Sequence, residues 1–269
     1  MEDRTRNIRL TLAYDGTAYH GFQRQAPQHG ATVQGTLEDT WRRMFGEEIR
    51  MNMAGRTDAG VHAAGQVINF WSSAPIPLEK IPKAFNSYLP RDIRILRSRE
   101  EGEKFNARRS ARWKRYDYRI DHHEIADVFQ RLYAWHEPVR LDRERMRRAA
   151  GFLEGKHDFY TFAAAGGVSR TFTRTLYRCR VGLEEELIRI TCVGDGFLYN
   201  MVRIIAGTLL AVGKGKLKPE DMPEILSSRD RSRAGQTAPP QGLTLTYVHY
   251  GEEEPETVFP ELFRESSPL

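Results

Sequence analysis

The chain has 269 residues, of which 29% are charged and 40% hydrophobic, and its formal net charge is +5. This balance excludes a disordered chain, and no apolar run is long enough to cross a bilayer, so we expect no membrane-spanning helix. Only two cysteines occur, Cys179 and Cys192, and their spacing fits neither a disulfide framework nor a zinc site. The N-terminal residues include no apolar signal region, which with the few cysteines predicts a cytoplasmic protein.

The first part of the chain contains both strand-like and helix-like patterns of apolar residues. Apolar residues alternate at strand spacing or recur at helical spacing, and Gly46 ends the first helical segment. The predicted strands are 8–14, 66–73 and 92–100, and the predicted helices are 32–45 and 77–90.

The second part repeats this mixture. The predicted strands are 113–120, 173–183, 187–197 and 243–250, and the predicted helices are 141–159, 197–215 and 219–230. Because strands often follow one another directly, the sequence predicts an α+β protein of two similar α/β halves with antiparallel sheets. We expect domains at residues 1–110 and 111–269, the first carrying the Asp58 loop described below and the second completing a cleft.

A strongly basic stretch covers residues 104–119, KFNARRSARWKRYDYR. It has seven Lys or Arg residues, one acidic residue and interleaved aromatic residues. Basic groups neutralise phosphates and aromatic rings stack on bases, so the stretch is typical of a nucleic-acid contact. A solvated strand face would have the same composition, and the stretch alone does not separate the two.

A second notable segment, AGRTDAGVHAAGQV, covers residues 54–67. Asp58 can act as a nucleophile, a general base, a metal ligand or a turn residue. The small residues around it let another molecule approach the backbone closely. Arg56 would lower the pKa of Asp58 if the two side chains meet. Because only His62 is a nearby potential ligand, a nucleophilic or electrostatic role is favoured over a metal site.

Residues 55–63, GRTDAGVHA, resemble the signature of the TruA family of tRNA pseudouridine synthases. Other motifs of that family follow in order over roughly 250 residues. They are YDGTAYHGFQRQ, VQGTLED, FNSYLPRDI, FNARRSARWKRYDYRI, GKHDF, GDGFLYNMVRIIAGTLLAVGKG and AGQTAPPQGLTL.

The resemblance implies a pseudouridine synthase fold with a basic central cleft. The implied function is isomerisation of uridine to pseudouridine at positions 38, 39 and 40 of the tRNA anticodon stem-loop, without cofactor or metal. Asp58 matches the catalytic aspartate of the family. Whether it attacks the ribose or the base, or removes a ribose proton, stays open.

The other site residues follow from the same resemblance. Arg56 matches the residue assigned to base flipping. Tyr116 matches the active-site tyrosine of the family, whose ring can stack on the uracil; by periodicity alone it could equally be a core tyrosine of the strand, as could Tyr118. Arg203 lies in an apolar helix where a buried arginine needs a partner, and we expect it to pair with Asp58. Leu243 would pack beside the target base.

Two segments match tRNA-binding parts of the family. They are Phe105, Asn106, Ala107, Arg108 and Arg109, and Gly166, Gly167, Val168, Ser169 and Arg170. The second match is looser, because relatives commonly have an arginine and a cysteine in place of Ala163 and Gly167. The family also implies a homodimer in which one tRNA contacts both subunits.

Two other functions fit parts of the pattern. An RNA hydrolase or nuclease would use Asp58 as a base, but the metal ligands expected of it are missing from the sequence. A non-catalytic tRNA-binding protein would keep the basic stretch and would not need Asp58.

Overall fold

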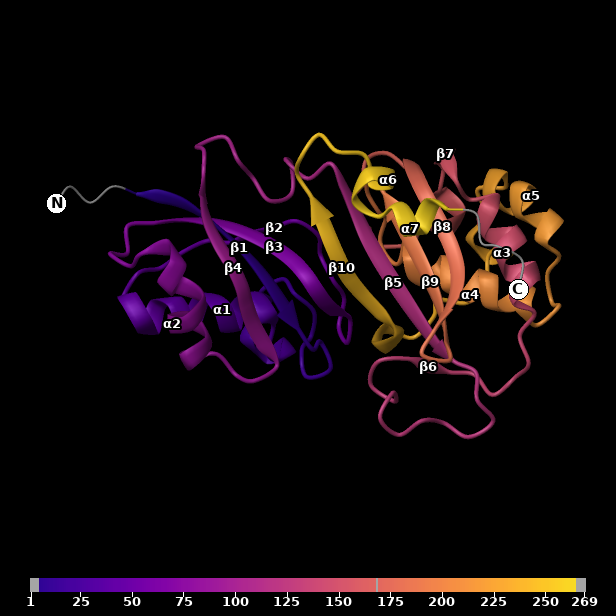
Figure 1. Cartoon of the computed structure of the whole chain (residues 1–269), viewed down its shortest axis with the longest axis horizontal. Coiled ribbons are helices and arrows are strands. Elements are labelled where there is room, and N and C mark those ends of the chain that lie inside the picture. The colour runs from indigo at the N-terminus through magenta and orange to yellow at the C-terminus, as the bar shows by residue number, and fades with distance from the viewer. Residues whose placement is uncertain (1–4, 168, 265–269) are drawn as a thin grey trace. The chain divides into compact units, whose positions relative to one another are not determined.

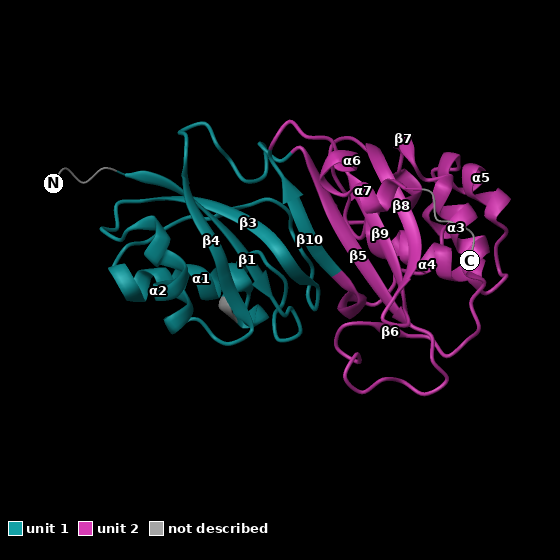
Figure 2. Cartoon of the chain, viewed as in Figure 1, with its two compact units in different colours: residues 1–111, 244–250 teal, residues 112–243, 251–269 magenta. Residues whose placement is uncertain are grey.

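The computed structural model describes residues 5–167 and 169–264. The chain forms two compact units (Figure 2): unit 1 is residues 1–111 with 244–250, and unit 2 is residues 112–243 with 251–269. The elements of unit 1 are β1 Arg6–Tyr14, α1 Val33–Phe45, β2 Asn52–Met53, β3 His62–Ser72, α2 Ile81–Tyr88, β4 Ile93–Glu101 and, apart from its first residue, β10 Leu243–His249. The elements of unit 2 are β5 Trp113–Asp121, β6 Trp135–His136, α3 Arg143–Gly151, β7 Gly155–Asp158, β8 Thr173–Glu184, β9 Leu187–Gly194, α4 Met201–Gly213, α5 Met222–Ser227, α6 Pro255–Val258 and α7 Pro260–Phe263.

The sheet of unit 1 has the strand order β4-β1-β3-β10, with β2 paired to β3 (Figure 1). Strand β1 is antiparallel to both β3 and β4, whereas β10 joins β3 in parallel, with Thr244 opposite His62. Strand β1 shows the alternation that its sequence predicts, because Ile8, Leu10 and Leu12 are fully buried and the residues between them are less so.

Helix α1 forms the centre of the unit 1 core. It begins after Thr32, whose side chain accepts a hydrogen bond from the backbone N–H of Gly35, and ends at Gly46 in the left-handed conformation. Trp41 is fully buried, and its ring lies 4.8 Å from Phe70 of β3 and 5.5 Å from Phe85 of α2. Both helices therefore cover the sheet face on which Phe70 lies.

The sheet of unit 2 has the strand order β5-β9-β8-β7, all antiparallel, with β6 parallel to β5. Helix α4 is buried along most of its length and packs against β5 and α3, and α3 packs against β8. Each unit thus combines a largely antiparallel sheet with helices, and the predicted α+β class is confirmed.

Some predicted elements were wrong in extent. The helix expected over 141–159 ends at Gly151, and Gly155–Asp158 instead forms β7, antiparallel to β8. Gly155 has φ +100°, which a helix cannot accommodate, and the edge of β8 supplies hydrogen-bond partners for the extended backbone. The periodicity of the sequence could not show that edge.

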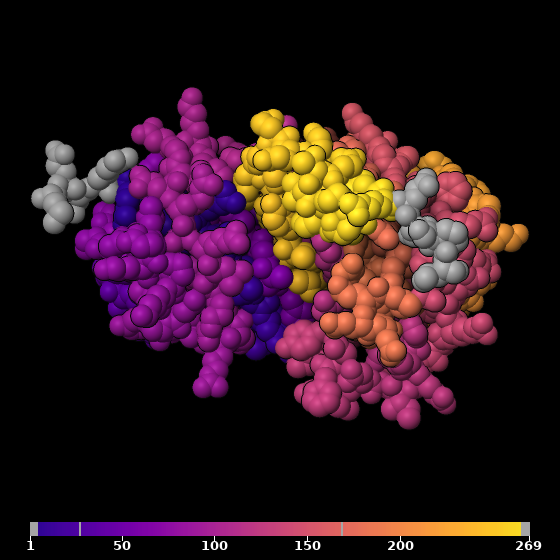
Figure 3. Space-filling view, viewed as in Figure 1, coloured from indigo at the N-terminus to yellow at the C-terminus, as the bar shows by residue number. Residues whose placement is uncertain are grey.

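The C-terminal segment adds two short helices, α6 and α7, that the sequence did not predict. Figure 3 shows this segment in yellow on the surface of unit 2. The carbonyl oxygen of Leu262 accepts a hydrogen bond of 2.8 Å from Nε of Arg178 on β8. None of the helices in the described part of the chain has the length and apolar character that crossing a bilayer requires.

We predict that Trp41→Ala lowers the free energy of unfolding by about 3–5 kcal/mol, because it leaves a cavity between α1, α2 and β3. Trp71→Ala is the matched control: Trp71 is 43% exposed, and its truncation should cost less than about 1 kcal/mol. Urea unfolding followed by far-UV circular dichroism measures both. Equal losses in the two variants would contradict the central role of Trp41.

Candidate active site

The Asp58 loop, residues 54–61, connects β2 to β3 in unit 1. Thr57 is only 3% exposed, whereas Asp58 is half-buried and Arg56 is exposed. The loop thus anchors itself through Thr57 and leaves the charged side chains on either side of it nearer the surface.

A buried tyrosine holds this anchor. The hydroxyl of Tyr14, at the end of β1, lies 2.7 Å from Oγ1 of Thr57. Nε2 of Gln66 donates to the carbonyl oxygen of Gly55 at 2.7 Å and to the Tyr14 hydroxyl at 3.5 Å. Burial raises the pKa of Tyr14 to about 12, so this hydroxyl stays neutral over the physiological range.

The segment that follows β1 packs against the other side of the loop. The backbone N–H of Phe22 donates to the carbonyl oxygen of Thr57 at 3.1 Å. A Cβ atom on Gly16 would lie 2.0 Å from the carbonyl oxygen of Val61, and Gly21 has φ +91°. These two positions therefore require glycine, and the glycines bring the two backbones into direct contact.

In unit 2, Tyr116 lies on β5 opposite Cys192 of β9 and is 7% exposed. Its ring makes an edge-to-face contact with Phe197, with 5.0 Å between the ring centroids. Tyr118, which has the same sequence periodicity, is fully buried, and its hydroxyl donates to the carbonyl oxygen of Pro239 at 2.8 Å. The structure thus gives Tyr118 a place in the core of unit 2.

Arg203 lies in the first turn of α4 and is half-buried. Its Nε donates to the carbonyl oxygen of Ala238 at 2.7 Å, and its Nη1 donates to Oδ1 of Asn200 at 2.8 Å. Two hydrogen bonds within unit 2 therefore orient the guanidinium group. Leu243, the first residue of β10, is 7% exposed. The pairing of Arg203 with Asp58 stays a prediction.

The segment Phe105–Arg109 forms a turn in unit 1. Oδ1 of Asn106 accepts hydrogen bonds from the backbone N–H groups of Arg108 and Arg109, and both arginines are exposed. Ala107 is fully buried; its N–H donates to Asn69, and its carbonyl oxygen accepts a hydrogen bond from the Tyr250 hydroxyl. The buried Ala107 thus anchors the turn through its backbone, and the two exposed arginines are available to phosphates.

The second predicted tRNA-binding segment is exposed in unit 2 at Gly166, Gly167, Ser169 and Arg170, and Val168 lies outside the described residues. Ser169 accepts a hydrogen bond of 2.8 Å from Nη2 of Arg174 and donates to the carbonyl oxygen of Thr171. Among the described residues, no three His, Cys, Asp or Glu side chains lie together in a group that could hold a metal ion.

Residues 11–108 and 149–251 match a family model described as tRNA pseudouridine synthase. Because these segments make up more than half of the chain, the chain belongs to the tRNA pseudouridine synthase family, as the sequence motifs predicted. Asp58, Arg203 and Leu243 fall within the matched segments, whereas Tyr116 falls between them.

The curated relatives indicate which kind of tRNA pseudouridine synthase the chain resembles. Proteins named tRNA pseudouridine synthase A are 48% identical in Moorella thermoacetica, 47% in Syntrophomonas wolfei and 46% in Caldicellulosiruptor bescii. The alignments cover 90–91% of this chain and 99%, 98% and 100% of the respective relatives. Among solved structures, a chain in a Cbf5–Nop10–Gar1 complex matches at a TM-score of 0.36 and 13% identity, over 92% of this chain and 60% of that chain. So distant a likeness carries no weight here.

Sequence reasoning missed the residues that support the site. The sequence pattern identifies Tyr14 only as an inward-facing strand residue, and it identifies Gln66 only as the first residue of a predicted strand. Phe197 was predicted to belong to a buried strand or helix end, with no indication that it contacts Tyr116. Each contact joins segments distant in sequence, so no local pattern marks it.

We predict that Tyr14→Phe removes a pH-dependent part of the stability. The pKa of Tyr14 is about 12 in the folded protein and about 10 in the unfolded chain. Between these values the unfolded chain loses the phenolic proton and the folded protein keeps it, so the free energy of unfolding falls as the pH rises. From pH 9 to pH 12 the wild type should lose on the order of 2 kcal/mol more than the variant.

Urea unfolding at both pH values measures this difference. Tyr88→Phe is the matched control, because Tyr88 is 52% exposed, and this variant should follow the wild type. The prediction is wrong if the Tyr14→Phe and wild-type stabilities fall in parallel.

Proposed function

We propose that the protein isomerises uridine to pseudouridine at positions 38, 39 and 40 of the tRNA anticodon stem-loop. The observation that carries this proposal is the Asp58 loop, in which the half-buried Asp58 carboxylate follows Thr57, a residue fixed by a buried hydrogen bond to Tyr14. Membership of the tRNA pseudouridine synthase family supports the assignment.

The reaction explains why one fixed carboxylate suffices. The N1–C1′ bond breaks, the uracil turns and a C5–C1′ bond forms. The hydrogen on C5 leaves as a proton, and the freed N1 takes up a proton. Substrate and product are isomers, so no oxidant, reductant or energy source is consumed. The ionised Asp58 carboxylate acts at the sugar or the base, and attack on either, or removal of a ribose proton, is compatible with this position.

The remaining residues hold the target nucleotide in this proposal. The reacting atoms are inaccessible inside a stem, so the nucleotide must leave the base stack. Arg56, which is exposed beside Asp58, occupies the vacated space and holds phosphate. Tyr116 stacks on the uracil, Leu243 packs beside it, and Arg203 pairs with Asp58 and keeps it ionised.

The tRNA contacts beyond the target nucleotide come from the two exposed segments. In segment 105–109, Arg108 and Arg109 bind phosphates, while the buried Ala107 fixes the turn. Segment 166–170 contributes Arg170 and backbone groups at Gly166 and Gly167. We further propose that the protein works in the cytoplasm as a homodimer in which one tRNA contacts both subunits.

We predict that Asp58→Asn lowers pseudouridine formation by at least about a thousandfold while tRNA binding is retained. Release of tritium from tRNA containing 5-³H-uridine measures the reaction directly, because C5–C1′ bond formation expels the C5 hydrogen. Asp39→Asn, an exposed carboxylate of α1 paired with Arg24, is the matched control and should keep full activity. Undiminished release by the Asp58 variant would refute the catalytic role, and no release by a folded, tRNA-binding wild type would refute the function.

We predict that Arg203→Gln lowers the rate about tenfold or more and moves the acid limb of the pH–rate profile to higher pH. Removing a guanidinium beside a carboxylate makes the carboxylate easier to protonate. Single-turnover tritium release between pH 5 and 9 measures both effects. Arg148→Gln, an exposed arginine of α3, is the control and should leave the profile unchanged. A slower variant with an unshifted acid limb would contradict the pairing with Asp58.

A further inference from the structure

One face of the unit 1 sheet has an unusual concentration of arginines. Ile8 and Leu10 of β1 are buried on the side of α1 and α2, so the residues between them face the other way. In the antiparallel register Arg9 lies opposite Arg99 and Thr11 opposite Arg97. Residues directly opposite each other share a face, so all three arginines lie on the side of the sheet away from the helices.

The charge on this face is predominantly positive. Glu101 accepts a hydrogen bond of 3.1 Å from Nη1 of Arg9 and forms an ion pair with Nε of Arg99 at 2.9 Å, so one carboxylate is shared by two arginines. Arg97 and Arg99 are both exposed. At the turn after β4, the exposed Glu103 and Lys104 offset each other, and so an excess of positive charge remains.

Aromatic rings lie among these arginines. Trp71 of β3 lies opposite Asn7 of β1, on the same face as Arg9, and is 43% exposed. The guanidinium of Arg9 lies 4.2 Å from the ring centroid of Tyr250 and 5.6 Å from that of Phe105. These rings fix Arg9, and the exposed indole of Trp71 presents a surface on which a base or ribose can stack.

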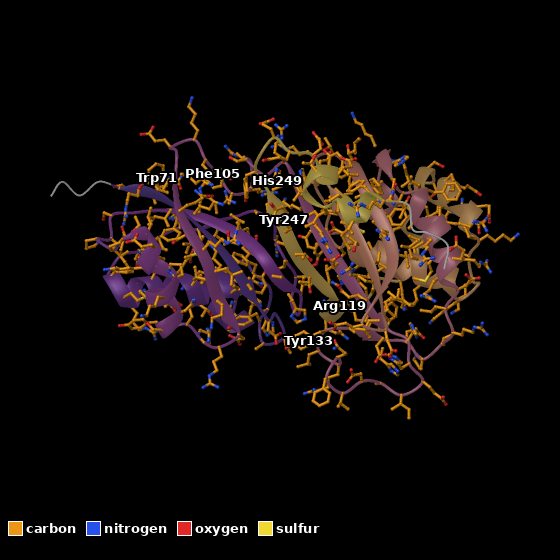
Figure 4. The ribbon with its side chains drawn as sticks, viewed as in Figure 1. Trp71, Phe105, Arg119, Tyr133, Tyr247 and His249 are labelled. Carbon is orange, nitrogen blue, oxygen red and sulfur yellow. The ribbon has the colours of Figure 1, made fainter. Side chains whose placement is uncertain are left out.

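The face is continuous with the turn of Arg108 and Arg109. The side-chain amide of Asn69 on β3 donates to Oδ1 of Asn7 at 2.8 Å, and this buried pair holds the turn. Nδ2 of Asn7 donates to the carbonyl oxygen of Phe105 at 3.0 Å, and Oδ1 of Asn69 accepts from the N–H of Ala107 at 2.8 Å. Figure 4 labels Trp71 and Phe105, which these contacts place at the same end of the strands.

The face is remote from Asp58, although the Asp58 loop begins beside the middle of β3, where the N–H of Ala54 donates to the carbonyl oxygen of Val67. Asp58 itself lies near the other end of the loop, because its carbonyl oxygen accepts a hydrogen bond of 3.1 Å from the N–H of Val61. That loop enters β3 at His62, and Asn69 lies seven residues further along the strand and Trp71 nine. At the rise of an extended strand, these residues are roughly 20–30 Å from His62. A phosphate held here therefore belongs to a part of the RNA well separated from the target uridine.

We infer that this arginine face, formed by Arg9, Arg97, Arg99, Arg108 and Arg109 with Trp71 and Phe105, binds the sugar-phosphate backbone of the tRNA body outside the anticodon stem-loop. The inference rests on the proposed function, since the RNA is the same substrate. It extends the contact proposed for segment 105–109 across strands β1, β3 and β4 and assigns this contact to the tRNA body. The arginines would bind phosphates, and the exposed indole of Trp71 would stack on a base or ribose.

The experiment compares full-length tRNA with an isolated anticodon stem-loop RNA, using the Arg97→Glu/Arg99→Glu variant. At 0.15 M salt the dissociation constant for full-length tRNA should rise on the order of tenfold, and the log–log salt dependence should become shallower by about two. Binding of the stem-loop should not change. The matched control is Lys80→Glu/Lys83→Glu, which alters the net charge equally on exposed residues at helix α2.

Two other results would overturn the inference. Full-length tRNA binding equal to that of the control would show that the face does not contact RNA. Equal weakening for both RNAs would place any contact on the stem-loop and not on the tRNA body. Tritium release by the wild type is followed separately, so a failed isomerisation assay would count against the proposed function while the binding data still decide the arginine face.

Discussion

The hydrogen bond between Tyr14 and Thr57 is the constraint on which the candidate active site depends. Asp58 is on a loop of small residues, which has little side-chain packing of its own to fix its conformation. The loop is held because Thr57 is buried against a hydroxyl at the end of β1 and because glycines at 16 and 21 let a second backbone contact it. Burial raises the pKa of the Tyr14 hydroxyl to about 12, so this hydroxyl stays protonated over the physiological range.

The same arrangement, a buried polar anchor beneath exposed charge, recurs at the Phe105–Arg109 turn. Asn7 and Asn69 are each 1% exposed, and their amides are satisfied by each other and by the backbone of the turn. Leaving such groups unpaired would cost about 1–3 kcal/mol each, so the turn and the sheet stabilise one another. The exposed arginines beside Ala107 are thereby presented on a rigid base, and less side-chain and loop entropy is lost when they bind phosphate.

Local periodicity was sufficient to predict most of the secondary structure. Strand β1 and helices α1 and α4 follow from alternation, capping and apolar composition, because each of these features acts between residues close in sequence. It was insufficient where a segment takes its conformation from a partner strand. Residues 155–158 became β7 because β8 offers an edge, and β10, near the C-terminal end, pairs with β3 from the first part of the chain.

The sequence by itself determined the family, the α+β class and the identity of the candidate catalytic residue, because motifs such as GRTDAGVHA fix chemistry through residue type and order. Only the tertiary structure decided which residues support that chemistry. It assigned Tyr14 to the anchor of Thr57, turned Ala107 inward and its neighbouring arginines outward, and placed Arg9, Arg97 and Arg99 on one face. Register and burial depend on contacts between distant segments, and a single sequence without its fold does not contain them.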